Sequence, residues 1–400
     1  MRWMVSAILL LLAHPAWAQD ERPTGYPRSA NEGSTKAVSL SAVYTADVRS
    51  DIDGGIARGT RYLDNLDLQV AVDAERLVGW HGARLFGYAI YNNGTHFSSD
   101  LAGATQGVSN IETGMRALRL FEAWVEQDVG RNASLKAGLY NLNSEFDTTQ
   151  SGGFFLLSSH GIGPDFSQSG RNGPSIFPVT SLAVRAEGKF GTHWLARVAV
   201  LDGVPGDPGH PAATAIKLSA RDGALVVGEV NYLSGGTKAA IGAWAYTGRF
   251  DAIPLGTAPS SGHGNSGTYV FAEHRWRGTR AEDADGLAGW LRFGIADTRY
   301  NPIARYLGGG LVYAGPFARR KTDQIGLSVA VAEFGDRYRR SQALSGEPAG
   351  PREIVIEAGY LAQLAPWLRV QPDVQYVVHP GGDTLVDHAV VAGFRIKVGQ

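Results

Sequence analysis

The feature that most constrains the fold is a series of short segments in which apolar and polar residues alternate one by one. Between residues 66 and 73, positions 66, 68, 70 and 72 are apolar while 67, 69 and 73 are polar. The same alternation occurs in residues 181–187 and 368–375. A period of two residues indicates β-strands with one apolar and one polar face.

About sixteen such segments follow one another, and each is about ten residues long. They cover residues 37–49, 62–77, 82–92, 115–128, 132–142, 178–190, 193–202, 222–233, 238–249, 267–277, 286–298, 305–315, 322–333, 352–362, 367–378 and 386–398. An even number of strands of this length is typical of a membrane-spanning barrel. The pattern therefore predicts an all-β fold, with residues 37–400 forming a single transmembrane antiparallel β-barrel of about 16 strands.

The connections between these segments alternate in length. Short ones lie at residues 79–81, 130–131, 191–192, 234–237, 278–285, 315–317 and 365–366, and long ones at 50–61, 93–114, 143–177, 203–221, 250–266 and 334–350, with shorter exceptions at 299–304 and 379–385. Short periplasmic turns and long extracellular loops are characteristic of outer-membrane barrels. Trp80, Trp194, Trp276 and Trp367 lie at or beside the short turns, where an aromatic girdle is expected, although tryptophan also marks strand ends in other β-proteins.

The N-terminus is typical of a secretory signal peptide. Residues 1–18 contain one basic residue (Arg2), an apolar run from Val5 to Ala13, and a small-residue cleavage site ending at Ala18. An uncleaved anchor is the alternative, but the apolar run is too short to span a bilayer. Residues 19–36 are polar and are predicted to be flexible. A signal peptide without a later apolar helix leaves the periplasm, the outer membrane or the exterior as locations.

Charge and cysteine content exclude several classes of function. The chain has 37 Lys and Arg against 38 Asp and Glu, and it has no Cys. Nucleic-acid binding requires a basic footprint, and disulfide scaffolds, Cys-ligated metals and thiol catalysis require cysteine. Ser158-Ser159-His160 has no carboxylate beside it in sequence, and residues 51–54 resemble a calcium loop without its distal Glu. We therefore expect no catalytic residues, no metal site and no cofactor.

The alternation also predicts which polar side chains face the lumen. The candidate channel-lining, substrate-binding residues are Glu122, Trp124, Glu126, Lys136, Arg185, Arg197, Glu229, Glu273, Arg275, Arg292, Asp373 and Arg395, and the same face carries Asp67, Gln69, Asp73, Glu187, Asn231, Glu357, Arg369, Gln371 and Gln375. Ion-selective pores carry rings of one charge sign. Interleaved acids and bases with an aromatic ring suit a neutral polyol instead. Alternatively, these charges only pair with one another and solvate the lumen.

A barrel of this size needs a narrowing element if it is to be selective. A sixteen-stranded barrel leaves an aqueous channel. Residues 143–177 form a long connection rich in glycine that also contains Phe154, Phe155, Phe166 and Phe177. Long loops with such residues are usually functional or packed. We hypothesise that this segment folds into the channel and forms the constriction.

Four stretches distributed along the chain are distinctive: LYNLNSEFD (139–147), NGPSIFP (172–178), LDGVPGDP (201–208) and QPDVQYVVHPGG (371–382). Together they resemble the OprB family of carbohydrate-selective porins, and the resemblance extends from about Tyr62 onward. It implies a sixteen-stranded outer-membrane porin for passive uptake of monosaccharides such as glucose, through a narrow channel lined by Arg, Glu and aromatic residues.

The expected environment follows from this resemblance. We expect the mature chain in the outer membrane of a Gram-negative bacterium, in contact with membrane lipid and lipopolysaccharide and inserted by the barrel assembly machinery. A homo-trimer and a monomer are both compatible with the sequence. Nucleic acid is not an expected partner. A general or differently selective porin remains an alternative, as does a soluble secreted β-lectin.

Overall fold

A computed structural model describes residues 36–256, 260–277, 286–347 and 349–399. The predicted signal peptide (1–18), nearly all of the predicted flexible segment (19–36) and the predicted short link at 278–285 lie outside the described residues.

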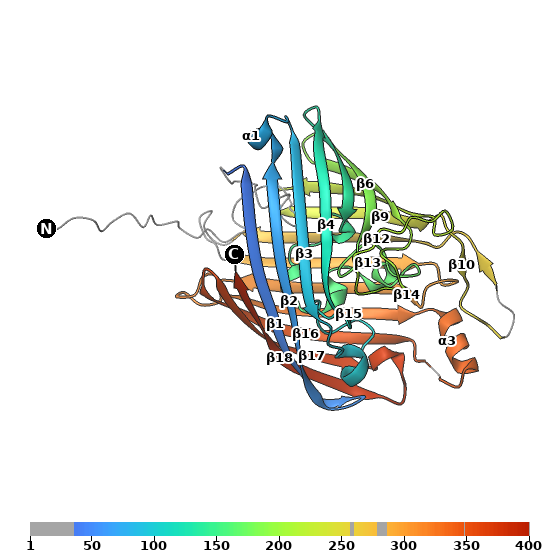
Figure 1. Cartoon of the computed structure of the whole chain (residues 1–400). Helices are drawn as coiled ribbons and strands as arrows, with labels where there is room; N and C mark the ends of the chain where they lie inside the picture. Colours follow the sequence, from blue (N-terminus) through green and yellow to red (C-terminus); the bar gives the residue numbers. More distant parts are fainter. Residues whose placement is uncertain (1–35, 257–259, 278–285, 348, 400) are drawn as a thin grey trace.

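Sixteen strands form one closed antiparallel barrel, which confirms the predicted fold class (Figure 1). They are β1 (Val38–Gly55), β2 (Gly59–Asp73), β3 (Ala83–Asn93), β4 (Arg116–Val129), β5 (Ala133–Tyr140), β6 (Ser181–Phe190), β7 (Trp194–Asp202), β8 (Ala224–Ser234), β9 (Thr237–Tyr246), β12 (Ser266–Arg277), β13 (Gly286–Ala296), β14 (Ile303–Ala314), β15 (Gln324–Phe334), β16 (Arg352–Ala365), β17 (Leu368–Val378) and β18 (Asp387–Gly399). Each strand pairs with its neighbour along the chain, β12 pairs with β9, and β1 closes the barrel against β18.

The remaining elements lie in the connections. β10 (Phe250–Asp251) and β11 (Ser261–Gly262) form a small separate ribbon, and the helical segments are α1 (Ala74–Val78), α2 (Pro164–Ser167), α3 (Asp336–Leu344), η1 (Ser98–Ala102), η2 (Leu142–Ser144), η3 (Gly152–Phe154), η4 (Ser158–His160) and η5 (Pro380–Gly382). Among the helices of the described ranges, none is long and apolar enough to cross a membrane. Figure 1 places α1 at the end of the barrel with short turns, and β10 and α3 at the end with long loops. We refer to these as the short-turn end and the long-loop end.

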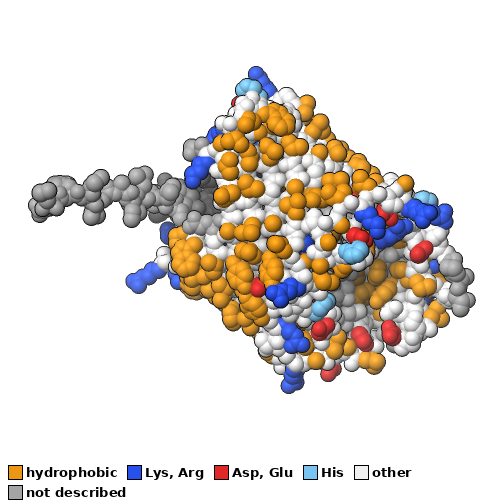
Figure 2. All heavy atoms as spheres, in the orientation of Figure 1, with side chains coloured by type: hydrophobic (Ala, Val, Ile, Leu, Met, Phe, Trp, Pro, Cys, Tyr) orange, Lys and Arg blue, Asp and Glu red, His pale blue; other side chains and the backbone are white. Residues whose placement is uncertain are grey.

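The outer wall of the barrel is apolar. Leu118, Ile241 and Leu327 are 68%, 64% and 59% exposed, and each is followed along its strand by a buried residue. Figure 2 shows hydrophobic side chains spread over this wall. A surface of this kind is stable in lipid and would associate in water. The four tryptophans at the short turns are about half exposed, as expected of residues in an aromatic girdle.

The first connection differs from the prediction. The sequence predicts a long loop at residues 50–61, whereas β1 continues to Gly55 and β2 begins at Gly59, so only residues 56–58 join them. Ser50 and Thr60 face each other across these strands and share a hydrogen bond of 2.7 Å. The prediction is wrong because this strand end is rich in aspartate and glycine, with Ile52 as its one large apolar residue, and such a segment has the composition of a loop.

The second strand is shorter than predicted. The alternation predicts a strand to residue 77, but β2 ends at Asp73. The Asp73 carboxylate accepts a hydrogen bond of 3.1 Å from the backbone N–H of Arg76 and caps α1. An aspartate in this position satisfies an N–H group that the helix itself cannot pair.

Closure of the barrel depends on a glycine in the last strand. Gly393 lies between Arg49 of β1 and Asp373 of β17 in the strand register, and the Arg49 guanidinium reaches across it to the Asp373 carboxylate at 2.6 Å. A Cβ atom on Gly393 would lie 2.0 Å from the Val48 carbonyl oxygen. Only glycine therefore fits between these strands without a backbone shift.

Gly393→Ala is expected to destabilise the barrel by about 1–3 kcal/mol, the usual cost of overpacking. The measurement is the denaturant concentration at which the heat-modifiable folded band converts to the unfolded band on a gel. Gly188→Ala is the matched control, because a Cβ atom at this β6 position meets no atom within 4 Å. Equal midpoints for the two variants would contradict this account of closure.

Candidate functional site: the lumen and its inner loop

The connection between β5 and β6, residues 141–180, folds into the barrel. We call it the inner loop. Its Phe166 is fully buried and stacks on Trp244 of β9, with ring centroids 5.0 Å apart. Leu225 and Val227 of β8 belong to the same buried cluster. This contact explains why β8 is apolar on both faces: one face meets lipid and the other meets the inner loop.

A second contact of the inner loop explains the glycine run of β14. Phe155 is buried against Trp290 and Val312. A Cβ atom at Gly310 would lie 3.1 Å from the Phe155 ring, and one at Gly308 would lie 2.3 Å from the Tyr306 hydroxyl. The run at 308–310 lacks visible periodicity because two of its glycines make room for aromatic side chains.

Wall carboxylates bind the backbone of the inner loop. Glu229 of β8 accepts from Asp147 N at 2.8 Å, and Glu273 of β12 accepts from the N–H groups of residues 150 and 151 at 2.9 and 3.1 Å. Glu357 of β16 accepts from the N–H groups of residues 156 and 157 at 2.6 and 3.1 Å. Buried backbone groups need such partners, and a loop lacks the ladder that a strand provides. The inner loop thus follows the wall from β8 to β16.

Arg292 of β13, which lies in the same stretch of wall between β12 and β14, also holds the inner loop. Its guanidinium donates to the Asp147 carboxylate at 2.7 Å and also to Asp165, and all three side chains are buried. The rings of Tyr269 and Tyr306 lie 5.5 and 5.3 Å from the guanidinium carbon. Two carboxylates of the loop therefore share one wall cation.

Glu145 anchors the start of the inner loop. Its carboxylate accepts from Lys136 at 2.9 Å, from Arg185 at 2.7 Å and from the Tyr140 hydroxyl at 2.6 Å. Burial raises the pKa of Glu145, but Lys136, Arg185 and Arg197 outweigh this effect and hold its pKa well below the ordinary value. The carboxylate therefore stays ionised, and this anchor persists in mild acid.

The β3–β4 connection, residues 94–115, covers another part of the wall. Ser109 donates to Asp47 of β1 at 2.7 Å, and the Gln375 amide of β17 donates to the Val108 carbonyl at 2.9 Å. The two connections also meet, because the N–H of residue 110 donates to the Leu156 carbonyl at 2.8 Å. Together they narrow the space that the sixteen strands enclose.

The predicted channel-lining residues lie on the inward face, and the two connections cover most of them. Those that are buried are Glu122, Trp124, Glu126, Lys136, Arg185, Glu229, Arg292 and Asp373. Those that remain partly accessible are Arg197, Glu273, Arg275 and Arg395. Within this set, Glu126, Lys136 and Arg185 come together around Glu145, and Arg197 lies 3.8 Å from Glu229. Their direct contact with a solute stays a prediction.

Several functional residues were not predicted from the sequence. Glu145, Asp147 and Asp165 lie in the inner loop, where no alternation marks a facing direction. Asp47 and Arg49 lie on the inward face of β1. They occupy alternate positions of the predicted strand 37–49, so the alternation could have identified them as inward-facing. A further signal was the surplus of acidic residues in a glycine- and phenylalanine-rich connection.

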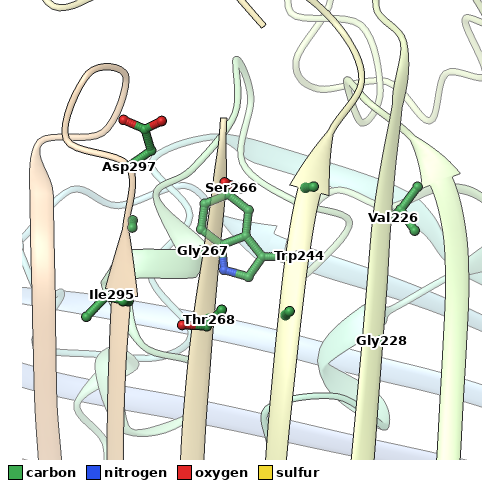
Figure 3. Close-up of a pocket in the computed structure, with 11 residues that line it drawn as sticks. Val226, Gly228, Trp244, Ser266, Gly267, Thr268, Ile295 and Asp297 are labelled. Atoms are coloured by element: carbon green, nitrogen blue, oxygen red, sulfur yellow. The ribbon is translucent and has the colours of Figure 1, made fainter. Parts of the chain in front are cut away.

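Among the hollows lined by the described residues, two lie against the outer wall. One, of about 610 Å³, lies over β8, β9, β12 and β13, where Val226, Thr268 and Ile295 alternate with buried inward residues (Figure 3). The other, of about 540 Å³, is lined by apolar residues such as Leu311, Leu327 and Val374. Because these side chains face the lipid, neither hollow belongs to a path for a polar solute.

Comparison with known proteins agrees with this architecture. The family model described as carbohydrate-selective porin, OprB family, matches residues 57–399. The chain is 25% identical to Porin B of Pseudomonas aeruginosa over 396 residues, which covers 88% of this chain and 86% of that protein. The high-pH structure of Pseudomonas putida OprB superposes with a TM-score of 0.81 at 21% identity, covering 92% of this chain and 97% of that one. The low-pH structure of the same protein gives a TM-score of 0.58 at 17% identity, covering 91% and 93%. Members of this family are channels rather than enzymes, and this chain belongs to the OprB family of carbohydrate-selective porins.

Proposed function

We propose that this carbohydrate-selective porin admits monosaccharides of the size of glucose by passive diffusion, through the part of the lumen that the inner loop leaves open. The observation that carries the proposal is the attachment of the inner loop to the wall. Glu229, Glu273 and Glu357 hold its backbone, and Arg292 holds its side chains. A loop fixed at so many points acts as a rigid constriction and discriminates between solutes by size.

The polar groups beside the open part of the lumen suit a sugar. Asp67 and Gln69 of β2 and Arg395 of β18 lie on the inward face and are partly accessible. Sugar hydroxyls donate to carboxylates and accept from guanidinium groups. Weak contacts of both kinds lower the cost of removing water from a sugar without trapping it, as conduction requires.

The surroundings of the channel are part of the same proposal. After cleavage near Ala18, the mature chain spans the outer membrane of a Gram-negative bacterium, where its outer wall contacts lipid and lipopolysaccharide. The barrel assembly machinery inserts it, and a homo-trimer is the proposed oligomer if it associates. The apolar outer wall and the tryptophans at the short-turn end support a membrane location.

The experiment is the uptake of solutes by proteoliposomes that contain the refolded protein. Glucose is expected to enter rapidly, and a disaccharide and a neutral amino acid slowly, because the proposed constriction is wide enough for one sugar ring and its groups pair with hydroxyls. Empty liposomes are the control. Equal rates for all solutes would contradict selectivity, and the absence of uptake would contradict a channel.

A further inference from the structure

We propose that Arg369 of β17 and Lys397 of β18 form an anion site in the lumen, and that the solutes of this channel include sugar acids, meaning monosaccharides that carry one carboxylate. The inference rests on the proposed function, since it assigns a substrate class to the same channel. It comes from the placement of these two cations rather than from the charge of the chain as a whole, which is −1.

The two cations lie directly opposite each other. Arg369 pairs with Lys397 in the register of β17 and β18, and both lie on the inward face. Side chains in directly opposed positions are about 5 Å apart at Cβ, and like charges there destabilise a sheet. This pair therefore lowers the stability of the barrel unless an anion occupies the space between the two groups.

Both side chains are accessible to water, unlike most charged residues of the inward face. Arg185, Arg292 and Glu357 are buried beneath the inner loop, whereas Arg369 and Lys397 are exposed. Their strand positions lie close to the short-turn end, beyond Gln371, whose amide donates to the Phe154 carbonyl of the inner loop at 2.8 Å. A solute that passes the constriction therefore reaches these two cations in open lumen.

Neither cation has a carboxylate within ion-pair distance among the described residues, although Asp67 of β2 faces Lys397 at longer range. The Arg369 Nε atom donates to the Gln363 side-chain oxygen at 2.7 Å, which is a neutral acceptor. Within the described ranges, the Lys397 ammonium forms no ion pair shorter than 4 Å. Both groups therefore retain hydrogen-bond donors for a ligand.

The acids that face this region already have donors. Asp47 binds Arg395 at 2.7 and 2.8 Å. Arg395 is a third cation, which lies on the inward face of β18 next to Lys397. Asp67 of β2 accepts from Asn65 at 2.5 Å and from Tyr88 at 2.6 Å.

Two acids on β2 and β4, farther from β18 along the barrel wall, are paired as well. Asp73 contacts Arg76 at 3.1 Å, and Asp128 contacts Arg84 at 2.5 Å. Three cations, Arg369, Arg395 and Lys397, against Asp47 and Asp67 leave a local surplus of one positive charge.

A surplus of one charge favours a monovalent carboxylate over a phosphate dianion. A guanidinium group binds carboxylates through two parallel hydrogen bonds, and an ammonium group adds a point charge. Conduction also requires that the solute leave again, which favours the more weakly held monoanion. An aldonate or a hexuronate combines one carboxylate with the size and hydroxyls of a monosaccharide.

The test is the ratio of glucuronate uptake to glucose uptake by proteoliposomes at low salt, with glucose 6-phosphate as a third probe. The wild-type protein is expected to admit glucuronate at a rate similar to that of glucose and faster than glucose 6-phosphate. In Arg369→Gln/Lys397→Gln the glucuronate-to-glucose ratio is expected to fall about fivefold for each charge removed, since a unit charge at 4 Å in water contributes about 1 kcal/mol. At 1 M salt the wild-type ratio is expected to fall as well, because the screening length shrinks to about 3 Å.

The control is Arg131→Gln, which removes one positive charge from an exposed residue of the β4–β5 turn. This variant is expected to keep the wild-type ratio. Glucose uptake without glucuronate uptake by the wild type would overturn the anion site and leave the proposed function intact. An unchanged ratio in the double variant, or an equal fall in Arg131→Gln, would also overturn it. If neither solute enters the wild type, the proposed function itself fails.

Discussion

Arg292→Met is expected to destabilise the barrel by about 3–5 kcal/mol, because it leaves two loop carboxylates buried without their shared cation. The side chains of Asp147 and Asp165 are 2% and 0% exposed, so water cannot replace the guanidinium. Methionine keeps most of the side-chain volume, so the expected loss comes from charge rather than from a cavity. The measurement is denaturant unfolding of the refolded barrel, followed by the heat-modifiable band or by tryptophan fluorescence.

Two further variants separate this effect from general damage. Arg292→Met/Asp147→Asn/Asp165→Asn is expected to recover most of the lost stability, since replacing a whole buried ion cluster by neutral groups is often harmless. Arg305→Met removes an arginine whose ion pair with Glu333 is exposed, and it is expected to cost less than about 1 kcal/mol. If the single and triple variants are equally unstable, the loop is not held by charge.

The pH dependence of the unfolding free energy is a second test of the contacts between Arg292 and the loop carboxylates. Burial raises the pKa of Asp147 in the wild-type protein, although Arg292 opposes this effect. A carboxyl group whose folded pKa is raised favours the folded state as the pH falls and loses that contribution as the pH rises through the folded pKa. The deficit of Arg292→Met is therefore expected to shrink in acid, where Asp147 is protonated.

The strands could be predicted from the sequence because their signal is local. Alternation between residues 66 and 73, for example, requires only that one face meets lipid and the other does not. The inward direction of Arg185 and Arg292 followed from the same rule. The rule failed at the ends of strands, as at residues 50–61, where no apolar band marks the outer face.

The contacts of the site could not be predicted, because they join residues far apart in the chain. Asp147 and Arg292 are 145 positions apart, and Leu156 and Glu357 are 201 apart. The sequence of the inner loop does not indicate which wall residue forms a hydrogen bond or ion pair with each of its groups. The assumption that inward residues are polar also failed, since Leu225 and Val227 face inward and pack on the inner loop.

Deletion of Gly152–Ser169 is expected to raise single-channel conductance roughly twofold or more, because it removes the part of the inner loop that crosses from β16 back to β13 and leaves a sixteen-stranded barrel with a wide lumen. The deletion also removes Phe155 and Phe166, so apolar wall residues such as Trp244 become accessible to water. The matched control is deletion of residues 336–346, which form α3 and its exposed C-terminal turn at the long-loop end. That control is expected to leave conductance near the wild-type value.

The proposed function requires that the inner loop, held by the wall charges, sets the size of the passage. The most direct measurement compares uptake of a monosaccharide and a trisaccharide by proteoliposomes containing the wild-type protein or the Gly152–Ser169 deletion. The wild type is expected to admit the monosaccharide and exclude the trisaccharide, while the deletion variant is expected to admit both. An unchanged size limit in the deletion variant would contradict this requirement.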